Sequence, residues 1–303
     1  MERILDRLFK RRRGAPQNET KPHGYAVMLD YPVRVSPRWG YGKPRHPQIS
    51  KILEVGRKDY ARRLSEICKL KDRLSQIPDG PPANALDPCW GPQRFFSSLD
   101  AIALYGMLVE FRPERLIEVG SGYSTKFARR AIRDHGLPTH ITSIDPEPRA
   151  EIDQICDRVI RQPLEEVDLS LFDELQSGDF LFIDSSHRTF TNSDVTIVFM
   201  DLLPRLREGV VVHFHDIFLP DDYPAEWNDR YYSEQYLLGT YLLSTKGSGI
   251  KILLPNGFIV RDRNLAEHCT PLREIVGVER SPDNPTSPYG IGGGSFWMQM
   301  GVR

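Results

Sequence analysis

One strand-like run that ends in two glycines constrains how this chain can fold more than any other stretch. It reads Leu116-Ile117-Glu118-Val119-Gly120-Ser121-Gly122. Such glycines permit a tight turn into a following helix and a close backbone approach, so a nucleotide-like ligand can lie at the carboxyl edge of the sheet. Glycine is also the commonest residue in sharp turns, and the run alone therefore predicts a strand-turn-helix unit more firmly than a ligand site.

Further short apolar runs follow this turn, and helical segments separate most of them. The predicted strands are 115–119, 140–144, 158–160, 180–183 and 210–214. Continuous apolar strands with helices between them are typical of a parallel sheet covered on both faces. The last predicted strands have no helices between them and indicate an antiparallel edge; they are 250–254, 258–260 and 295–301. From these eight candidate runs we predict an α/β fold with a doubly wound, mostly parallel seven-stranded sheet and an antiparallel C-terminal edge.

The N-terminal part of the chain differs from the rest in charge. Residues 1–80 hold 19 Lys and Arg against 9 Asp and Glu, whereas residues 81–303 hold 21 against 32. Apolar residues recur at helical spacing from Ile49 to Ile77, which predicts an amphipathic helix or a helix pair. We expect a basic N-terminal arm and helical cap over residues 1–82, and an α/β domain over residues 83–303.

The composition also limits where the protein is expected to work. The cysteines show no C-x-x-C spacing, no apolar stretch approaches the roughly 20 residues of a spanning helix, and no apolar leader is evident. These features predict a cytoplasmic protein with no transmembrane segment and no nucleic-acid partner. Residues 1–13 mix apolar and basic side chains, which suggests contact with a membrane surface, although a frayed basic tail explains them as well.

A carboxylate after the second predicted strand strengthens the ligand interpretation. Asp145 follows the glycine turn at about the separation at which an acidic side chain binds ribose hydroxyls. The alternative is that Asp145 caps a helix before Pro146. A dinucleotide fingerprint would require a third glycine where Thr125 stands, so a dinucleotide-dependent oxidoreductase is the weaker interpretation.

Two more strand ends carry groups with acid-base chemistry. Asp184 and His187 follow the fourth predicted strand, and His215 and Asp216 follow the fifth. Both strand ends belong to the ligand edge of a parallel sheet. Carboxylate oxygens suit hard divalent cations, and the ordinary histidine pKa of about 6.5 suits a general base near neutrality.

In order and spacing, these motifs resemble the class I S-adenosylmethionine-dependent methyltransferases, from about Leu99 to the C-terminus. The resemblance implies that S-adenosylmethionine is the cofactor and that residues 83–303 form its binding domain. The amino acid portion of the cofactor would lie on the loop from Glu118 to Thr125, and its ribose on Asp145. The residues implied to bind the cofactor are Glu118, Gly120, Gly122, Ser124, Thr125, Asp145, Gln162 and Leu164, the last two beside the adenine.

The catalytic end resembles a narrower group, the metal-dependent O-methyltransferases, which include catechol O-methyltransferase and enzymes that methylate sugars on macrolides. In that group an Asp after strand four and an acidic pair after strand five hold Mg²⁺, and a basic residue three positions after the first Asp removes the hydroxyl proton. The resemblance implies Mg²⁺ or Mn²⁺ on Asp184, His215 and Asp216, with His187 as the general base. His215 stands where the group has an acidic residue.

The expected function is transfer of a methyl group to a hydroxyl of a small-molecule acceptor, a sugar or another secondary metabolite, with Asp184, His187 and His215 as catalytic residues. A metal-independent methyltransferase acting on nitrogen or a peptide is the first alternative, and a cofactor-binding scaffold is another. A dense aromatic stretch suits a stacking wall for the acceptor, although core packing explains at least half of it; it comprises Tyr223, Trp227, Tyr231, Tyr232 and Tyr236. The sequence leaves open whether the protein forms a homo-oligomer.

Overall fold

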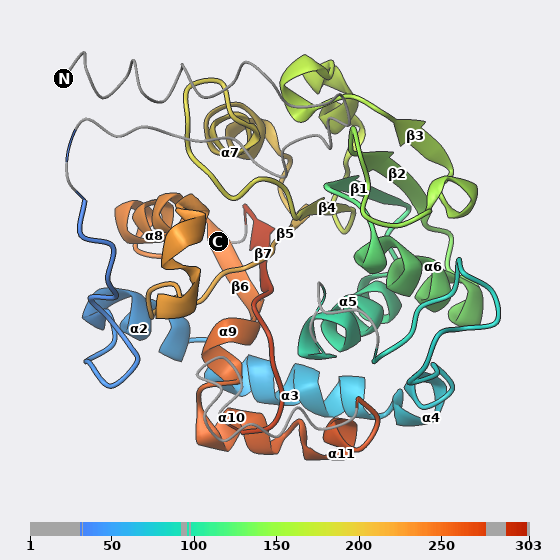
Figure 1. Cartoon of the computed structure of the whole chain (residues 1–303), viewed down its shortest axis with the longest axis horizontal. Coiled ribbons are helices and arrows are strands. Elements are labelled where there is room, and N and C mark those ends of the chain that lie inside the picture. Colours follow the sequence, from blue (N-terminus) through green and yellow to red (C-terminus); the bar gives the residue numbers. More distant parts are fainter. Residues whose placement is uncertain (1–30, 32, 92–95, 97, 277–288, 302–303) are drawn as a thin grey trace, which may run out of the picture. The chain divides into compact units, whose positions relative to one another are not determined.

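The described part of the chain contains a seven-stranded sheet whose strands lie in the order β3-β2-β1-β4-β5-β7-β6 (Figure 1). The computed structural model describes residues 31, 33–91, 96, 98–276 and 289–301. The strands are β1 (Arg115–Val119), β2 (His140–Ile144), β3 (Arg158–Ile160), β4 (Phe180–Ile183), β5 (Val211–Phe214), β6 (Ile250–Pro255) and β7 (Phe296–Met300). Strands β1 to β5 pair in parallel, and β7 pairs antiparallel with both β5 and β6. This confirms the predicted α/β fold.

The strand order places the glycine turn where a ligand site is expected. From β1 the chain proceeds through β2 to β3 on one side, and then returns to place β4 and β5 on the other side of β1. Such a reversal leaves a crevice at the carboxyl ends of the two central strands. Every residue of β4 and of β5 is buried, which explains why their sequences are continuous apolar runs rather than alternating ones.

Helices cover the sheet in the part of the chain from residue 36 onward, which forms one compact unit separate from residues 1–35. The α-helices are α2 (Pro47–Glu54), α3 (Arg57–Cys68), α4 (Lys71–Leu74), α5 (Ser98–Phe111), α6 (Tyr123–His135), α7 (Asp194–Ile197), α8 (Glu234–Thr245), α9 (Asn256–Ile259), α10 (Arg263–Glu267) and α11 (Thr270–Arg273). Shorter or wider helical turns are η2 (Asp153–Ile155), η3 (Leu164–Glu166), η4 (Leu169–Glu174), η5 (Val198–Leu202), η6 (Leu203–Arg205) and η7 (Ala225–Arg230). Within the described residues, no helix is both long enough and apolar enough to cross a membrane.

The predicted helical cap over residues 49–77 is divided into three helices rather than one or two. The first break falls at Gly56, where a Cβ would lie 2.4 Å from the Tyr60 ring, so the chain needs a glycine at this turn. Helix α3 packs against α5 and β6, and α2 packs against α8. The predicted boundary between residues 82 and 83 stays a prediction, and the predicted membrane contact of residues 1–13 lies outside the described residues.

The predicted strand 258–260 is wrong, because these residues lie in and directly after helix α9. Three buried apolar residues in a row fit a strand or a buried helix equally well. In the structure Gly257 instead permits close packing, since a Cβ there would lie 2.4 Å from the carbonyl oxygen of Ile217. The antiparallel edge is therefore built from β6 and β7 alone.

Candidate functional site

A cavity of about 320 Å³ opens at the carboxyl ends of β1, β2 and β4, within the size range of small-molecule sites. The residues that line it are Phe96, Val119, Gly120, Ser121, Gly122, Tyr123, Ser124, Ile144, Asp145, Pro146, Glu147, Arg149, Pro163, Leu164, Glu165, Asp184, Ser185, Ser186 and Asp194. Gly120 has a left-handed φ of 79°, and a Cβ there would lie 1.8 Å from the carbonyl oxygen of Asp184. The absence of a side chain thus lets the ends of β1 and β4 approach each other beneath the cavity.

Behind the glycine turn, the predicted cofactor residues bind one another. The buried carboxylate of Glu118 accepts hydrogen bonds from Ser124 Oγ, at 2.5 Å, and from Thr125 Oγ1. Thr125 Oγ1 in turn accepts from the backbone amide of Gly122 at 3.0 Å. Burial raises the pKa of Glu118 to about 7. Thr125, at the position of the missing third glycine, therefore supports the turn, whereas Ser124 both supports it and lines the cavity.

Asp145 lies at the end of β2 and lines the same cavity. Its two carboxylate oxygens accept backbone hydrogen bonds from Ser121 and Glu147, each at 2.8 Å. No helix begins at Asp145, so the capping alternative does not apply to this residue. Leu164 is buried and lines the cavity, but Gln162 is exposed and lies outside its lining.

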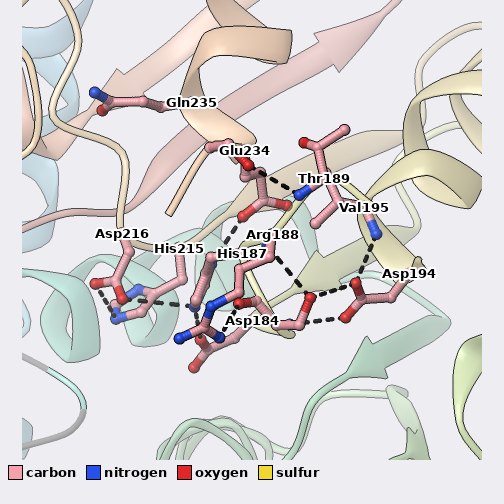
Figure 2. Close-up of polar contacts among 12 residues, drawn as sticks. Asp184, His187, Arg188, Thr189, Asp194, Val195, His215, Asp216, Glu234 and Gln235 are labelled. Carbon is pink, nitrogen blue, oxygen red and sulfur yellow. Dashed lines mark hydrogen bonds and ion pairs between the residues drawn. The ribbon is translucent and has the colours of Figure 1, made fainter. Parts of the chain in front are cut away.

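Beyond Asp184, a buried cluster of acidic and histidine side chains gathers around His187 (Figure 2). His187 Nε2 lies 3.3 Å from Asp184 Oδ1 and 3.5 Å from Asp216 Oδ2. On the other side of the ring, Nδ1 lies 2.8 Å from Glu234 Oε2 at the start of α8. The structure therefore brings together Asp184 and Asp216, which the sequence placed on neighbouring strand ends, with His187 between them.

The carboxylates around His187 determine its charge. Burial lowers the pKa of His187, but hydrogen bonds to Asp184 and Glu234 and the charge of Asp216 outweigh it, and the pKa lies well above its usual value. His187 is consequently an imidazolium ion near neutral pH. Burial acts to raise the pKa of Asp184, but His215 and His187 hold it well below its usual range. For Asp216, burial dominates and its pKa is raised.

His215 is part of the cluster but lies beside the carboxylates rather than between them. Its Nε2 is 3.6 Å from Asp216 Oδ1, and its ring packs against Phe96 with centroids 5.2 Å apart. Burial lowers the pKa of His215, but the charges of Asp184 and Asp216 outweigh this and raise it. The neighbouring His213 is fully buried, stacks on Phe182 and contacts Ser295 Oγ, which are structural contacts.

The predicted metal ligands do not fit a divalent cation in this arrangement. The space between Asp184 and Asp216 is occupied by the imidazole ring of His187, whose nitrogen contacts both carboxylates. The ring supplies the positive charge that a metal ion would bring. Over the described ranges, no group of three or more His, Cys, Asp or Glu side chains is arranged to hold a metal ion. The predicted Mg²⁺ or Mn²⁺ site on Asp184, His215 and Asp216 is therefore not supported.

Two contacts that hold the site were not found from the sequence. Glu234, fully buried, binds His187 although 47 positions separate the two residues. Asp194 accepts hydrogen bonds from the backbone amide and the hydroxyl of Ser186, at 2.7 and 2.6 Å. No local pattern marks Glu234, since its role arises only where α8 packs beside the loop after β4. Asp194 stands at the start of α7, where an acidic residue is common in any helix, so its sequence position does not indicate the contact with Ser186.

Comparison with known proteins finds a methyltransferase family model that matches part of this chain. Residues 117–217 match the family model described as a methyltransferase domain, a stretch that runs from β1 to just beyond β5 and includes the glycine turn, Asp184, His187 and Asp216 but not Glu234. This match, which covers a third of the chain, indicates a methyltransferase domain. An uncharacterized protein of Archaeoglobus fulgidus is 27% identical over 132 residues, which are 42% of this chain and 59% of that protein. The matched region thus spans less than two thirds of that relative's length.

Two solved structures are similar at low sequence identity. The SAH-bound methyltransferase PaMTH1 of Podospora anserina is 16% identical with a TM-score of 0.39, covering 67% of this chain and 78% of that chain. A structure of cmcI with SAH is 15% identical with a TM-score of 0.38, covering 76% of this chain and 91% of that chain.

Proposed function

We propose that the protein transfers a methyl group from S-adenosylmethionine to a hydroxyl of a small-molecule acceptor, a sugar or another secondary metabolite. The observation that carries the proposal is the position of the cluster Asp184–His187–Asp216, in which His187 is buried and the two carboxylates are partly buried. It lies at the edge of the cavity that the glycine turn and Asp145 create, because Asp184 belongs to both. A cofactor in that cavity would thus have acid-base groups close to its reactive end.

The cavity has features that suit S-adenosylmethionine. Its lining includes a left-handed glycine, a strand-end carboxylate and an apolar side chain: Gly120, Asp145 and Leu164. Each oxygen of Asp145 accepts one backbone bond and retains a lone pair for a ribose hydroxyl. Leu164 offers an apolar surface for an adenine ring. When bound, the cofactor supplies a methyl group on a positively charged sulfur.

His187 is better suited to hold the cluster than to remove the acceptor's proton. Both of its ring nitrogens face carboxylates, and its raised pKa leaves little neutral ring near neutral pH. Asp216 is the more basic of the two strand-end carboxylates, since burial raises its pKa whereas that of Asp184 is lowered. We therefore assign proton removal to Asp216: as the acceptor oxygen takes the methyl group, its proton passes to the Asp216 carboxylate. His187 keeps Asp184 and Asp216 in place.

Replacing Asp145 by alanine is expected to weaken binding of S-adenosylhomocysteine by roughly 1–3 kcal/mol, the scale of a lost hydrogen bond to a charged group. Isothermal titration calorimetry measures this directly. Asp153→Ala is the matched control, because Asp153 is an exposed carboxylate that pairs with Arg161 and does not line the cavity. Equal affinities of wild type and Asp145→Ala would remove Asp145 from the cofactor site.

Excess chelator is expected to leave methyl transfer unchanged, because the imidazolium of His187 already neutralises the two carboxylates that a metal ion would need. The measurement compares turnover before and after dialysis against EDTA. A loss of turnover that Mg²⁺ or Mn²⁺ restores would contradict this expectation. It would instead support the predicted cation site on Asp184, His215 and Asp216.

The proposal as a whole is tested by mass spectrometry. The protein is incubated with S-adenosylmethionine and a panel of hydroxylated sugars and phenols, and products heavier by one methylene unit are sought together with S-adenosylhomocysteine. Products methylated on nitrogen, with no product on oxygen, would overturn the assignment of a hydroxyl acceptor. Failure of the protein to bind S-adenosylhomocysteine would overturn the proposal itself.

A further inference from the structure

The loop that carries His187 is joined to the segment before α8 by several hydrogen bonds. The carbonyl oxygen of His187 accepts from the backbone amides of Ser233, at 2.8 Å, and Glu234, at 3.2 Å. Thr189 donates its backbone amide to Ser233 Oγ at 2.8 Å. These hydrogen bonds join residues 187–189 to residues 233–234 beside the acid-base cluster.

Arg188 lies in the first of these segments, and Trp227, Arg230 and Tyr232 lie on the stretch of chain that precedes the second. The Tyr232 ring lies 4.7 Å from the His187 ring, and the guanidinium of Arg188 lies 5.0 Å from the Tyr232 ring. The guanidinium of Arg230 lies 4.0 Å from the Trp227 ring and 5.6 Å from the Tyr232 ring. Arg188 Nε also donates to the carbonyl oxygen of Arg230 at 2.9 Å, which links the two arginines.

Neither guanidinium is neutralised within the described ranges. Arg188 uses Nε and Nη1 to donate to backbone oxygens, and Arg230 makes only its two contacts with aromatic rings. No ion pair joins either one to a carboxylate of the described residues, although Glu226 and Asp229 lie on the same short helix, η7, as Arg230. Arg188 is half-buried and Arg230 is exposed, so both retain hydrogen-bond donors that a ligand can reach.

We propose that Arg188 and Arg230 bind an anionic group, a phosphate or a carboxylate, on the methyl acceptor, while Trp227 and Tyr232 pack against its ring. This inference rests on the proposed function and specifies its substrate class. A planar guanidinium held by stacking loses little freedom when it binds an oxyanion with parallel hydrogen bonds. The two arginines also add positive charge beside three carboxylates that share one imidazolium, which reduces the repulsion of an anionic acceptor.

The position of the pair relative to the cofactor cavity supports this assignment. Asp184, Ser185 and Ser186 line the cavity, and the chain continues directly into His187 and Arg188. An acceptor anchored by Arg188 and Arg230 would thus lie beside the cluster. Aromatic packing would orient its ring, and the two cations would fix the end that carries the anion.

In the experiment, the protein is first loaded with S-adenosylhomocysteine. Glucose 6-phosphate, glucuronate or glucose is then added, and binding is followed by tryptophan fluorescence, to which Trp227 contributes. Wild type is compared with Arg188→Gln and Arg230→Gln, and with Arg263→Gln as the control, since Arg263 is an exposed arginine on α10. A thermal melt of each variant shows that it is folded. We expect at least one anionic probe to bind more tightly than glucose, and each site variant to weaken it about tenfold or more.

The outcomes distinguish a phosphate from a carboxylate on the acceptor. They also distinguish failure of the anionic subsite from failure of the proposed function. A preference for glucose 6-phosphate indicates a phosphorylated acceptor, and a preference for glucuronate indicates a carboxylated one. Equal affinity for all three probes, no binding of either anion, or binding that both arginine variants leave unchanged overturns the anionic subsite. Binding of S-adenosylhomocysteine is measured separately, and its failure contradicts the proposed function. In that case the anion titration is carried out on the unloaded protein and still tests Arg188 and Arg230.

Discussion

His187→Ala is expected to lower turnover by about 10²-fold, the scale that follows when catalytic groups are displaced by about 1 Å. Without the ring, Asp184 and Asp216 lose the cation that lies between them. The buried carboxylate of Glu234 also loses its contact with His187 Nδ1. Because His187 does not line the cofactor cavity, the affinity for S-adenosylhomocysteine should stay near wild type. Steady-state kinetics and calorimetry on the same preparation measure both quantities.

The matched control for this variant is His140→Ala, since His140 is an exposed histidine at the amino end of β2, away from the cavity. If His187→Ala does not fold, His187→Gln keeps hydrogen-bond donors in the cluster and preserves the test. Full turnover in a folded His187 variant would remove His187 from the mechanism.

The same residue gives wild-type stability a defined pH dependence. The unfolded chain releases the His187 proton near pH 6.5, whereas the carboxylates raise the folded-state pKa well above this value. The charged ring therefore contributes its full stability below about pH 6.5, and that contribution is lost as the pH rises through the folded-state pKa. Denaturant unfolding should show a decline of wild-type stability over this range that is shallower in His187→Gln. Parallel curves would contradict the raised pKa.

Gly120→Ala is expected to abolish cofactor binding and to destabilise the protein by roughly 2–5 kcal/mol. The new Cβ would lie 1.8 Å from the carbonyl oxygen of Asp184, so the ends of β1 and β4 must separate, which adds an overpacking cost of about 1–3 kcal/mol. The left-handed φ of 79° adds about 1–2 kcal/mol for a residue with a side chain. Calorimetry with S-adenosylhomocysteine and denaturant unfolding measure the two effects.

Gly136→Ala separates these two causes. Gly136 also has a left-handed φ, 54°, at the end of α6, but a Cβ there would meet nothing within 4 Å. Its replacement should therefore cost only the conformational term and leave cofactor binding intact. Equal effects of the two substitutions would show that the approach of β1 to β4 is not what requires Gly120.

The sequence by itself determined the central sheet and the strand ends that form the site. Strands buried on both faces must be continuous apolar runs, as β4 and β5 are. Together with β1 and β2, they lie within one residue of their predicted bounds. Parallel strands end at one edge, so Asp145, Asp184 and Asp216 could be assigned to that edge without coordinates. These inferences succeed because they depend only on local periodicity and on the geometry of a parallel sheet.

The tertiary structure alone decided what the site residues contact. The predicted base, His187, is an imidazolium because α8 brings Glu234 to its Nδ1 while Asp184 and Asp216 face its Nε2. Three carboxylates around one buried ring change its pKa, and sequence spacing contains no information about such long-range proximity. Helix α9, predicted as a strand, likewise depends on the close packing of Gly257 against Ile217. Local pattern therefore set which side chains reach the edge of the sheet, and packing between distant segments set their charge and their partners.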